Sequence, residues 1–407
     1  MPLPYTLALR PQWPALIDFD WARPLAEWQD DRLVDLPRGI SRHTVRFVEV
    51  EDSLFALKEL PQHAANRDYA GLRRLEELGA SAVRAVGLVE RPGDHQAETG
   101  AVLITRYADY SFSYRELLSG GGFGERRTQL LDAFAFLLVE LHLLGCFWGD
   151  CSLSNTLYRY DADAIETLLV DAETTELHDE LSSGQRMHDL EIMAMNVAGE
   201  MADIAAGRGL EVDDADLALG EDIERRYQGL WRELAAEQRL PADAAQYQVT
   251  ERVQRLNDLG FEVEDITVVP HPERGHIHLQ LKVADRHFHT HRLRALTGVE
   301  TSENQARQIL SDLRYYEMRH GAGRSPTGKA LTAVRWRVEE FEPWLRRLAR
   351  HLPAGSDPVQ AYCDVLYHRY VMSVGAGHDV GTEAAFQTWL REGRPGYPLP
   401  ASTDLVP

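Results

Sequence analysis

The feature that most constrains this chain is a polar pattern within residues 146–173, CFWGDCSLSNTLYRYDADAIETLLVDAE. Asp150 is followed five positions later by Asn155, and Asp171 ends an apolar run at residues 168–170. Carboxylate and amide oxygens are the ligands that hard divalent cations prefer in proteins. We therefore expect a loop and a strand end to bring these three side chains together, where they could hold a divalent metal and act on a nucleophilic hydroxyl.

Length and charge narrow the class of protein. The 407 residues suffice for two or three domains and a substantial core. Forty-three Lys and Arg against 64 Asp and Glu give a formal net charge of -21, which argues against nucleic acid as a partner.

The three cysteines show no C-x-x-C spacing, which favours a reducing compartment. The N-terminus lacks the features of a signal peptide, and no stretch approaches the roughly 20 apolar residues of a membrane span. We expect a cytoplasmic protein with no transmembrane segment.

Short apolar segments in the first 60 residues predict β-strands. Residues 32–37, 44–50 and 54–60 form three such segments, and the polar break between the last two predicts a hairpin. Residues 38–43 would connect the first two strands. Residues 101–107 predict a further strand.

An amphipathic segment at residues 66–79 predicts a helix that ends at Gly79. At about 100° per residue, Asp68 projects within about 20° of the centre of the apolar stripe, Glu76 about 100° away and Glu77 on the opposite side. The stripe consists of Leu72, Leu75 and Leu78. Asp68 is therefore the acid that faces inward, although an Asp favoured near a helix N-terminus by the helix dipole is an equal alternative.

Six features follow one another along the chain: Ala56-Leu57-Lys58, RDYAGLRRLEELG, the strand that ends near residue 106, an apolar helix at 128–144, WGDCSLSN and LLVDAE. Their order resembles the protein-kinase-like superfamily, especially the lipopolysaccharide-core (Kdo/heptose) kinases and the aminoglycoside phosphotransferases. More closely, GISRHTVRFV, FWGDCSLSNTLYR, LLVDAETTELH and LTGVETSENQAR resemble an uncharacterised bacterial family, domain of unknown function 4032, over most of the chain.

The resemblance implies roles for the polar residues. Lys58, oriented by Asp68, would grip the α- and β-phosphates of ATP. Asp150 would position the acceptor hydroxyl and take its proton, while Asn155 and Asp171 would chelate Mg2+. A solvated lysine at a strand end is the alternative for Lys58 taken alone.

The resemblance also implies a nucleotide site built from six residues. A phosphate-covering loop, a small residue under the adenine and a hinge would supply Gly39, Ser41, Arg42, Ala56, Arg106 and Tyr107. Only Gly39 matches a glycine of the G-x-G-x-x-G pattern, so an ordinary turn is the alternative for residues 38–43.

The chain departs from the kinase pattern in two places. Trp148 and Gly149 replace the His and Arg of H-R-D, and Ala172 and Glu173 replace the Phe and Gly of D-F-G. Because the Arg that reads a phosphorylated activation loop is absent, we expect no activation of that kind. For Glu173 an exposed acid at a strand end is favoured over a metal or water contact. Asp189, on a predicted helix at 187–204, corresponds to the buried Asp that braces the catalytic loop.

A second region begins near residue 240. A helix at 242–259 and two alternating strands, 261–269 and 276–284, are predicted. The next residues alternate histidines, His287, His289 and His291, which on one strand face could bind zinc, although a solvated or anion-attracting edge is favoured. This segment also carries Arg286, Arg292 and Arg294, the one locally basic stretch. Helices at about 301–319, 333–351, 357–373 and 382–392 complete the chain.

We therefore predict an α+β protein: a two-lobed protein-kinase-like fold with an additional C-terminal α+β module. The expected boundaries are 1–110 for the N-lobe, 111–240 for the C-lobe and 241–407 for the module. The predicted function is an ATP-dependent phosphotransferase that moves the γ-phosphate of Mg-ATP to a hydroxyl of a small molecule, glycan or protein, an anionic acceptor being one option. The alternatives are a pseudokinase or nucleotide-binding scaffold that recruits a partner through the C-terminal module, and nucleotidyl transfer on the same fold.

Overall fold

The structure is a computed structural model, and it divides the chain into two compact units. It describes residues 4–36, 43–93, 97, 99–117, 126–235, 238–241, 245–270, 276–283, 286–321 and 326–396. Unit 1 consists of Met1–Tyr158 and Thr167–Leu230, and unit 2 of Arg159–Glu166 and Trp231–Pro407. The chain is thus a mixed helical and sheet protein, as predicted. The assignment of residues 159–166 to unit 2 has no counterpart in the sequence patterns.

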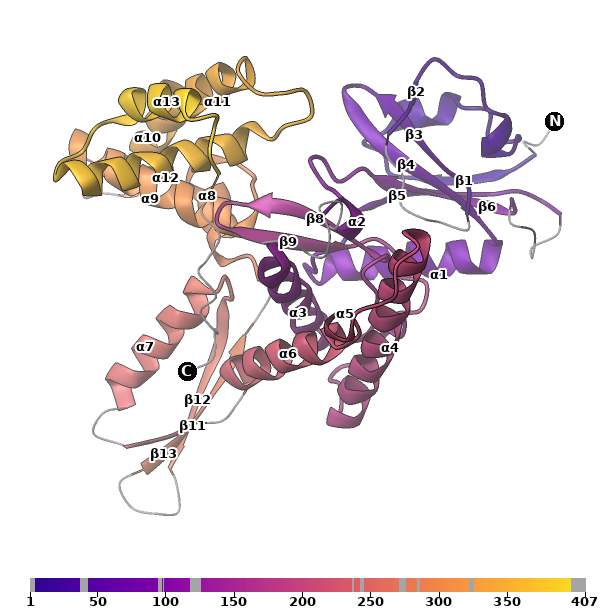
Figure 1. The fold of residues 1–407 in the computed structure, drawn as a ribbon, viewed down its shortest axis with the longest axis horizontal. Coiled ribbons are helices and arrows are strands. Elements are labelled where there is room, and N and C mark those ends of the chain that lie inside the picture. Colours follow the sequence, from indigo (N-terminus) through magenta and orange to yellow (C-terminus); the bar gives the residue numbers. More distant parts are fainter. Residues whose placement is uncertain are drawn as a thin grey trace. The chain divides into compact units, whose positions relative to one another are not determined.

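Unit 1 contains a six-stranded antiparallel sheet in the order β1-β5-β6-β4-β3-β2 (Figure 1). Its strands are β1 (Thr6–Leu9), β2 (Leu33–Val34), β3 (Val45–Val50), β4 (Ser53–Leu60), β5 (Ala85–Glu90) and β6 (Ala101–Arg106). Strands β3 and β4 form the predicted hairpin. Helix α1 (Gln62–Glu77) packs against β4, β5 and β6.

The two faces of β4 have different surroundings. Phe55 and Leu57 are fully buried in a core, while Ala56 and Lys58 alternate with them on the other face. The core is completed by an N-terminal cap that includes the 3-10 helices η1 (Pro14–Asp18) and η2 (Leu25–Glu27). The prediction of strands throughout the first 60 residues is therefore wrong for this part, because the cap is built from the large apolar residues Leu16, Phe19, Trp21, Leu25 and Trp28.

The rest of unit 1 is mostly helical. Its helices are α2 (Tyr114–Leu117), α3 (Arg127–Leu143), α4 (Ser183–Gly207), α5 (Asp214–Leu217) and α6 (Leu219–Ala235), the last of which runs on into unit 2. Helix α3 is apolar and almost wholly buried, and it leads to the short strand β7 (Cys146–Phe147), which pairs with β10 (Glu176–Leu177). The segment that contains Asp150 follows β7 directly.

A hairpin connects the polar residues of the catalytic pattern. Strand β8 (Thr156–Asp161) begins directly after Asn155, and β9 (Ala164–Leu169) ends two residues before Asp171. The N–H of Val170 donates to the carbonyl oxygen of Asn155 at 3.0 Å. The start of β8 and the end of β9 therefore lie side by side, as expected, and the meeting of the three side chains stays a prediction.

Unit 2 combines a three-stranded sheet, in the order β11-β13-β12, with helices around a separate core (Figure 1). The strands are β11 (Gln238–Pro241), β12 (Val263–Pro270) and β13 (His276–Val283). The helices are α7 (Ala245–Asp258), α8 (Phe288–Thr297), α9 (Glu303–His320), α10 (Pro326–Trp336), the π-turn η4 (Arg337–Phe341), α11 (Glu342–Ala349), α12 (Pro358–Ala376) and α13 (Thr382–Arg391). None of the helices in the described ranges is long and apolar enough to cross a membrane.

The alternating histidines do not lie on a strand. Helix α8 begins at Phe288, and a spacing of two in a helix turns successive side chains about 200° apart, so His289 points away from His287 and His291, whose ring centroids lie 5.7 Å apart. His289 is buried against Glu303, with 2.7 Å between Nδ1 and Oε1, whereas His291 is exposed. Among the described residues no three His, Cys, Asp or Glu side chains are grouped to hold a metal ion, so the zinc hypothesis is wrong there.

Candidate active site

Lys58 is the cation of the candidate site. Strand β4 places it opposite Val45 of β3 and Leu103 of β6. Its Nζ lies 2.6 Å from Oδ2 of Asp171 and 3.3 Å from Oδ2 of Asp68. One ammonium group therefore joins a sheet strand, a helix and the segment that follows β9.

Asp68 is the acid on α1 that reaches Lys58. Its side chain is fully buried, and its Oδ1 accepts the N–H of Ala172 at 2.9 Å. The other two acids weighed from the sequence lie elsewhere, since Glu76 pairs with Arg10 and Glu77 with Arg74. Asp68 thus orients both the lysine and the backbone next to Asp171.

The electrostatics of this cluster keep Lys58 charged. Burial lowers the pKa of Lys58, but the negative charges of Asp171 and Asp68 outweigh that effect, so the pKa lies above its ordinary value. Burial and the charge of Asp171 raise the pKa of Asp68 to about 7, against the opposing effects of Lys58 and of the Ala172 N–H. Asp171 is therefore the main anionic partner of Lys58.

A glycine in the middle of α1 allows the segment after β9 to approach. A Cβ atom on Gly71 would lie 2.8 Å from the carbonyl oxygen of Ala172, closer than side-chain carbons pack. Glu173 is half-buried, so the expectation of an exposed acid at this position is wrong. Its charge also contributes to the raised pKa of Lys58. Close packing on α1 thus restricts the backbone that follows Asp171.

Asp150 is held by two asparagines. Nδ2 of Asn155 donates to Oδ2 of Asp150 at 2.9 Å, and Nδ2 of Asn196 donates to Oδ1 at 3.0 Å. Asn196 also donates to the carbonyl oxygen of Cys151 at 3.1 Å. Both carboxylate oxygens are therefore fixed in direction. Asn196 was not identified from the sequence.

Helix α4 supplies a polar stripe that braces the whole loop. Asp189 is fully buried and accepts the N–H groups of Trp148 and Gly149 at 2.7 and 2.8 Å, which confirms its predicted bracing role. Glu200 accepts the N–H groups of Leu153 and Ser154 at 3.0 and 2.8 Å. Positions seven and eleven after Asp189 lie within about 20° of it on a helix. That spacing is the signal by which Asn196 and Glu200 could have been found.

Gly149 stands where the kinase pattern H-R-D has an arginine, and the backbone geometry explains the glycine. Its φ of +77° lies in the left-handed region, which residues with a Cβ atom rarely adopt. Beside it Trp148 is fully buried, and its carbonyl oxygen accepts the Thr174 hydroxyl at 2.8 Å. The sequence W-G-D thus builds a tight turn that links the Asp150 loop to the segment after Asp171.

The predicted nucleotide residues are only partly described. Gly39, Ser41 and Arg42 lie outside the described residues. Ala56 lies between Phe47 and Thr105 in the sheet register, on the same face as Lys58. Of the two predicted hinge residues, Arg106 is the last residue of β6 and Tyr107 follows it.

The backbone N–H groups of the two hinge residues are already engaged. The Arg106 N–H donates to Arg84 O and the Tyr107 N–H to Leu54 O, each at 2.9 Å. The Arg106 guanidinium binds Leu54 O at 2.6 Å and Asp109 at 3.0 Å. These two N–H groups are therefore not available to donate to a nucleotide base.

A sheet-borne lysine paired with two acids, beside a braced Asp-Asn loop, has the arrangement of a kinase-type phosphotransferase site. Comparison with known families agrees with this class. Residues 44–207 match the model of the lipopolysaccharide kinase (Kdo/WaaP) family, and residues 229–393 match the model of domain of unknown function 4032. The resemblance to the kinase-like superfamily is confirmed. The second model covers the C-terminal part rather than most of the chain, so FWGDCSLSNTLYR and LLVDAETTELH lie within the first.

Among solved structures, the chain is similar to one described as WaaP in complex with acyl carrier protein. The identity is 15%, the match covers 62% of this chain and 98% of that chain, and the TM-score is 0.36. None of the curated proteins matches the chain.

Proposed function

We propose that this protein transfers the γ-phosphate of Mg-ATP to a hydroxyl group of a small molecule, a glycan or a protein. The observation that carries the proposal is the contact of Lys58 with both Asp171 and Asp68, beside an Asp150 whose two carboxylate oxygens are fixed. The match of residues 44–207 to a kinase family supports the same class of reaction.

The side chains at this site suit magnesium. The donor side of the Asn155 amide is turned to Asp150, so its Oδ1 is the atom that would bind a cation together with the carboxylate of Asp171. All of these ligand atoms are oxygens, which magnesium prefers. When bound, magnesium would neutralise part of the phosphate charge.

Lys58 and Asp150 would bind the phosphates and the acceptor hydroxyl, respectively. Lys58 is held in its protonated form and would attract the α- and β-phosphates. Asp150 would align the acceptor hydroxyl and take its proton, and the two asparagine amides keep its carboxylate in one orientation. Catalysis in this class depends mainly on such positioning and charge stabilisation.

The proposal includes several predictions from the sequence. The adenine would lie on the sheet face that carries Ala56, and residues 39–42 would cover the phosphates. The part up to residue 110 and the following part of unit 1 would form two lobes around the nucleotide, and residues 241–407 would form an additional module. The three cysteines are buried as thiols, which supports a reducing compartment such as the cytoplasm.

An unbiased assay tests the proposal. The protein is incubated with a metabolite extract and ATP labelled at the γ-phosphate, and the products are analysed by mass spectrometry. We expect at least one hydroxyl compound to gain the labelled phosphate in the presence of Mg2+ and not in the presence of a chelator. Labelling that occurs equally with the chelator would contradict the proposal.

A further inference from the structure

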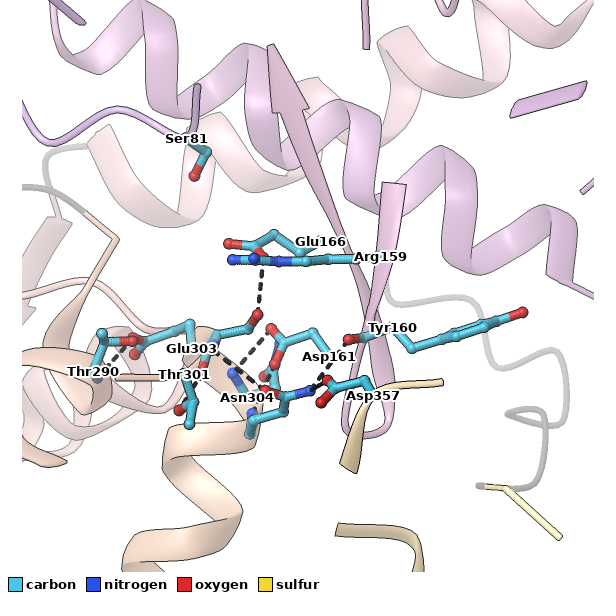
Figure 2. A network of polar contacts seen from close by, with 12 residues as sticks. Ser81, Arg159, Tyr160, Asp161, Glu166, Thr290, Thr301, Glu303, Asn304 and Asp357 are labelled. Atoms are coloured by element: carbon cyan, nitrogen blue, oxygen red, sulfur yellow. Dashed lines mark hydrogen bonds and ion pairs between the residues drawn. The ribbon is translucent and has the colours of Figure 1, made fainter. Parts of the chain in front are cut away.

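The hairpin β8–β9 connects the two candidate metal ligands to unit 2. Asn155 precedes its first strand and Asp171 follows its second, and both lie in unit 1. The turn end, Arg159–Glu166, belongs to unit 2. Figure 2 shows polar side chains of unit 2, among them Asn304 and Asp357, beside Asp161 at this end of the hairpin.

Asp161 is the centre of that network. It is fully buried, and its Oδ1 accepts the N–H of Gln305 at 2.7 Å. Its Oδ2 accepts the backbone N–H and the side-chain Nδ2 of Asn304 at 3.0 and 2.9 Å (Figure 2). These N–H groups lie in the first turn of α9, where a helix has no internal acceptors for them. The hairpin thus provides the anionic cap of a helix in unit 2.

Other parts of the turn are held in the same way. The Ser302 hydroxyl donates to Glu166 Oε2 at 3.0 Å, and Glu166 also pairs with Arg159 (Figure 2). The side-chain amide of Gln360 accepts the N–H of Ala162 at 2.8 Å and donates to its carbonyl oxygen at 3.0 Å. Both strands and the turn between them are therefore attached to unit 2.

Burial of a carboxylate at a turn is costly unless hydrogen bonds compensate for the lost solvation. Asp163, two residues further along the same turn, shows the ordinary alternative, because it forms a half-exposed ion pair with Arg307 at 2.9 Å. Such surface pairs contribute little to stability. The buried, multiply bonded Asp161 is therefore a specific attachment, and Asp163 is not.

The other end of the hairpin is hydrogen-bonded to the segment between α1 and β5 in unit 1. Besides the Val170–Asn155 bond, the Leu169 N–H donates to Ser81 O and the Val83 N–H to Leu169 O, each at 2.9 Å. The paired strands join this end to the turn. We propose that unit 2 positions the candidate metal ligands Asn155 and Asp171 by holding the hairpin turn, and that Asp161 is the positioning residue. This inference rests on the proposed function.

Three variants of the full chain test the inference. Asp161→Asn removes the charge and one acceptor from the network, and Asn304→Ala removes one donor from the side of α9. Asp163→Asn is the matched control, with the same change of charge in the same turn. The measurement is the Mg2+ concentration that gives half of the ATP-dependent rise in melting temperature. We expect it to rise roughly 10-fold to 100-fold in Asp161→Asn, as for residues that orient metal ligands, to rise less in Asn304→Ala, and to stay within about twofold in the control.

A metal-free measurement completes the test. The Val170 amide lies at the other end of the hairpin from Asp161. Its hydrogen exchange should be faster in Asp161→Asn and Asn304→Ala than in the wild type and the control. If Asp161→Asn does not fold, Asn304→Ala decides. Unchanged Mg2+ dependence and unchanged Val170 exchange in the folded variants would overturn the inference. Absence of any Mg-ATP effect in the wild type would instead contradict the proposed function, and Val170 exchange would still decide whether unit 2 holds the hairpin.

Discussion

Lys58 Nζ and Asp171 Oδ2 lie 2.6 Å apart although 113 positions separate the two residues in the sequence. The contact joins β4, the fourth strand in the sheet order β1-β5-β6-β4-β3-β2, to the segment that follows β9. Asp68 lies behind the same ammonium group at 3.3 Å. A single cation therefore organises two acids from different elements.

Lys58→Met should weaken nucleotide binding because it removes the charge that would face the phosphates. It also leaves Asp68 and Asp171 without their cation, which we expect to destabilise the nucleotide-free protein by roughly 1–3 kcal/mol. Melting curves with and without Mg-ATP measure both effects. In the wild type, Mg-ATP at a hundredfold its Kd should stabilise the fold by about 2.7 kcal/mol, and this gain should be largely lost in the variant.

Asp68→Ala provides the comparison for that experiment. It keeps the ammonium group but frees it to move, so Mg-ATP binding should fall less than in Lys58→Met. Equal binding in all three proteins would show that the Lys58 cluster does not contact the nucleotide.

Gly71→Ala should destabilise unit 1 because the added Cβ would lie 2.8 Å from the carbonyl oxygen of Ala172. Overpacking of this kind costs about 1–3 kcal/mol. Gly199→Ala on α4 is the matched control, since nothing lies within 4 Å of its Cβ position. Alanine is favoured over glycine inside a helix by roughly 0.5–1 kcal/mol, so the control should be stabilised. Chemical denaturation measures both free energies of unfolding, and the same sign in both variants would contradict the close packing of α1 on the Asp171 segment.

Asn196→Ala should slow phosphoryl transfer with little effect on ATP binding. The substitution removes the hydrogen bond from Asn196 to Oδ1 of Asp150, and small displacements of a catalytic group cost up to about 100-fold in rate. Met195→Ala, at the neighbouring exposed position, is the control and should keep the wild-type rate. Initial rates of labelled phosphate transfer and ATP titrations separate the two quantities. A wild-type rate in Asn196→Ala would mean that this asparagine does not position Asp150.

Local periodicity was sufficient where a residue faces its own element's core. The angle of Asp68 on α1 predicted its inward direction. The brace of the Asp150 loop by Asp189 was predicted instead from the resemblance to kinases. The run of histidines shows the limit of such patterns, because alternation at spacing two has no structural meaning at the start of helix α8.

Contacts between residues far apart in the sequence could not be predicted from such periodicity. Residues 160–163 have the sequence of an ordinary turn, yet Asp161 bonds to Gln305, 144 positions away. Asn196 and Glu200 can be found from the sequence only if Asp189 is first taken to face the Asp150 loop, because they are identified by lying on the same face of α4. The N-terminal cap was mistaken for strands because its burial depends on the sheet that it covers.

The most direct test of the central claim is a comparison of Asp150→Asn with the wild type in ATP binding and in phosphoryl transfer. Asparagine keeps the size of the side chain but cannot take the proton of the acceptor hydroxyl. We predict that ATP affinity stays nearly normal while transfer of the labelled γ-phosphate falls by about 100-fold to 10,000-fold, as for a lost general base. An unchanged transfer rate in Asp150→Asn, or a wild-type protein that binds Mg-ATP but labels no hydroxyl compound, would contradict the account and favour a nucleotide-binding scaffold.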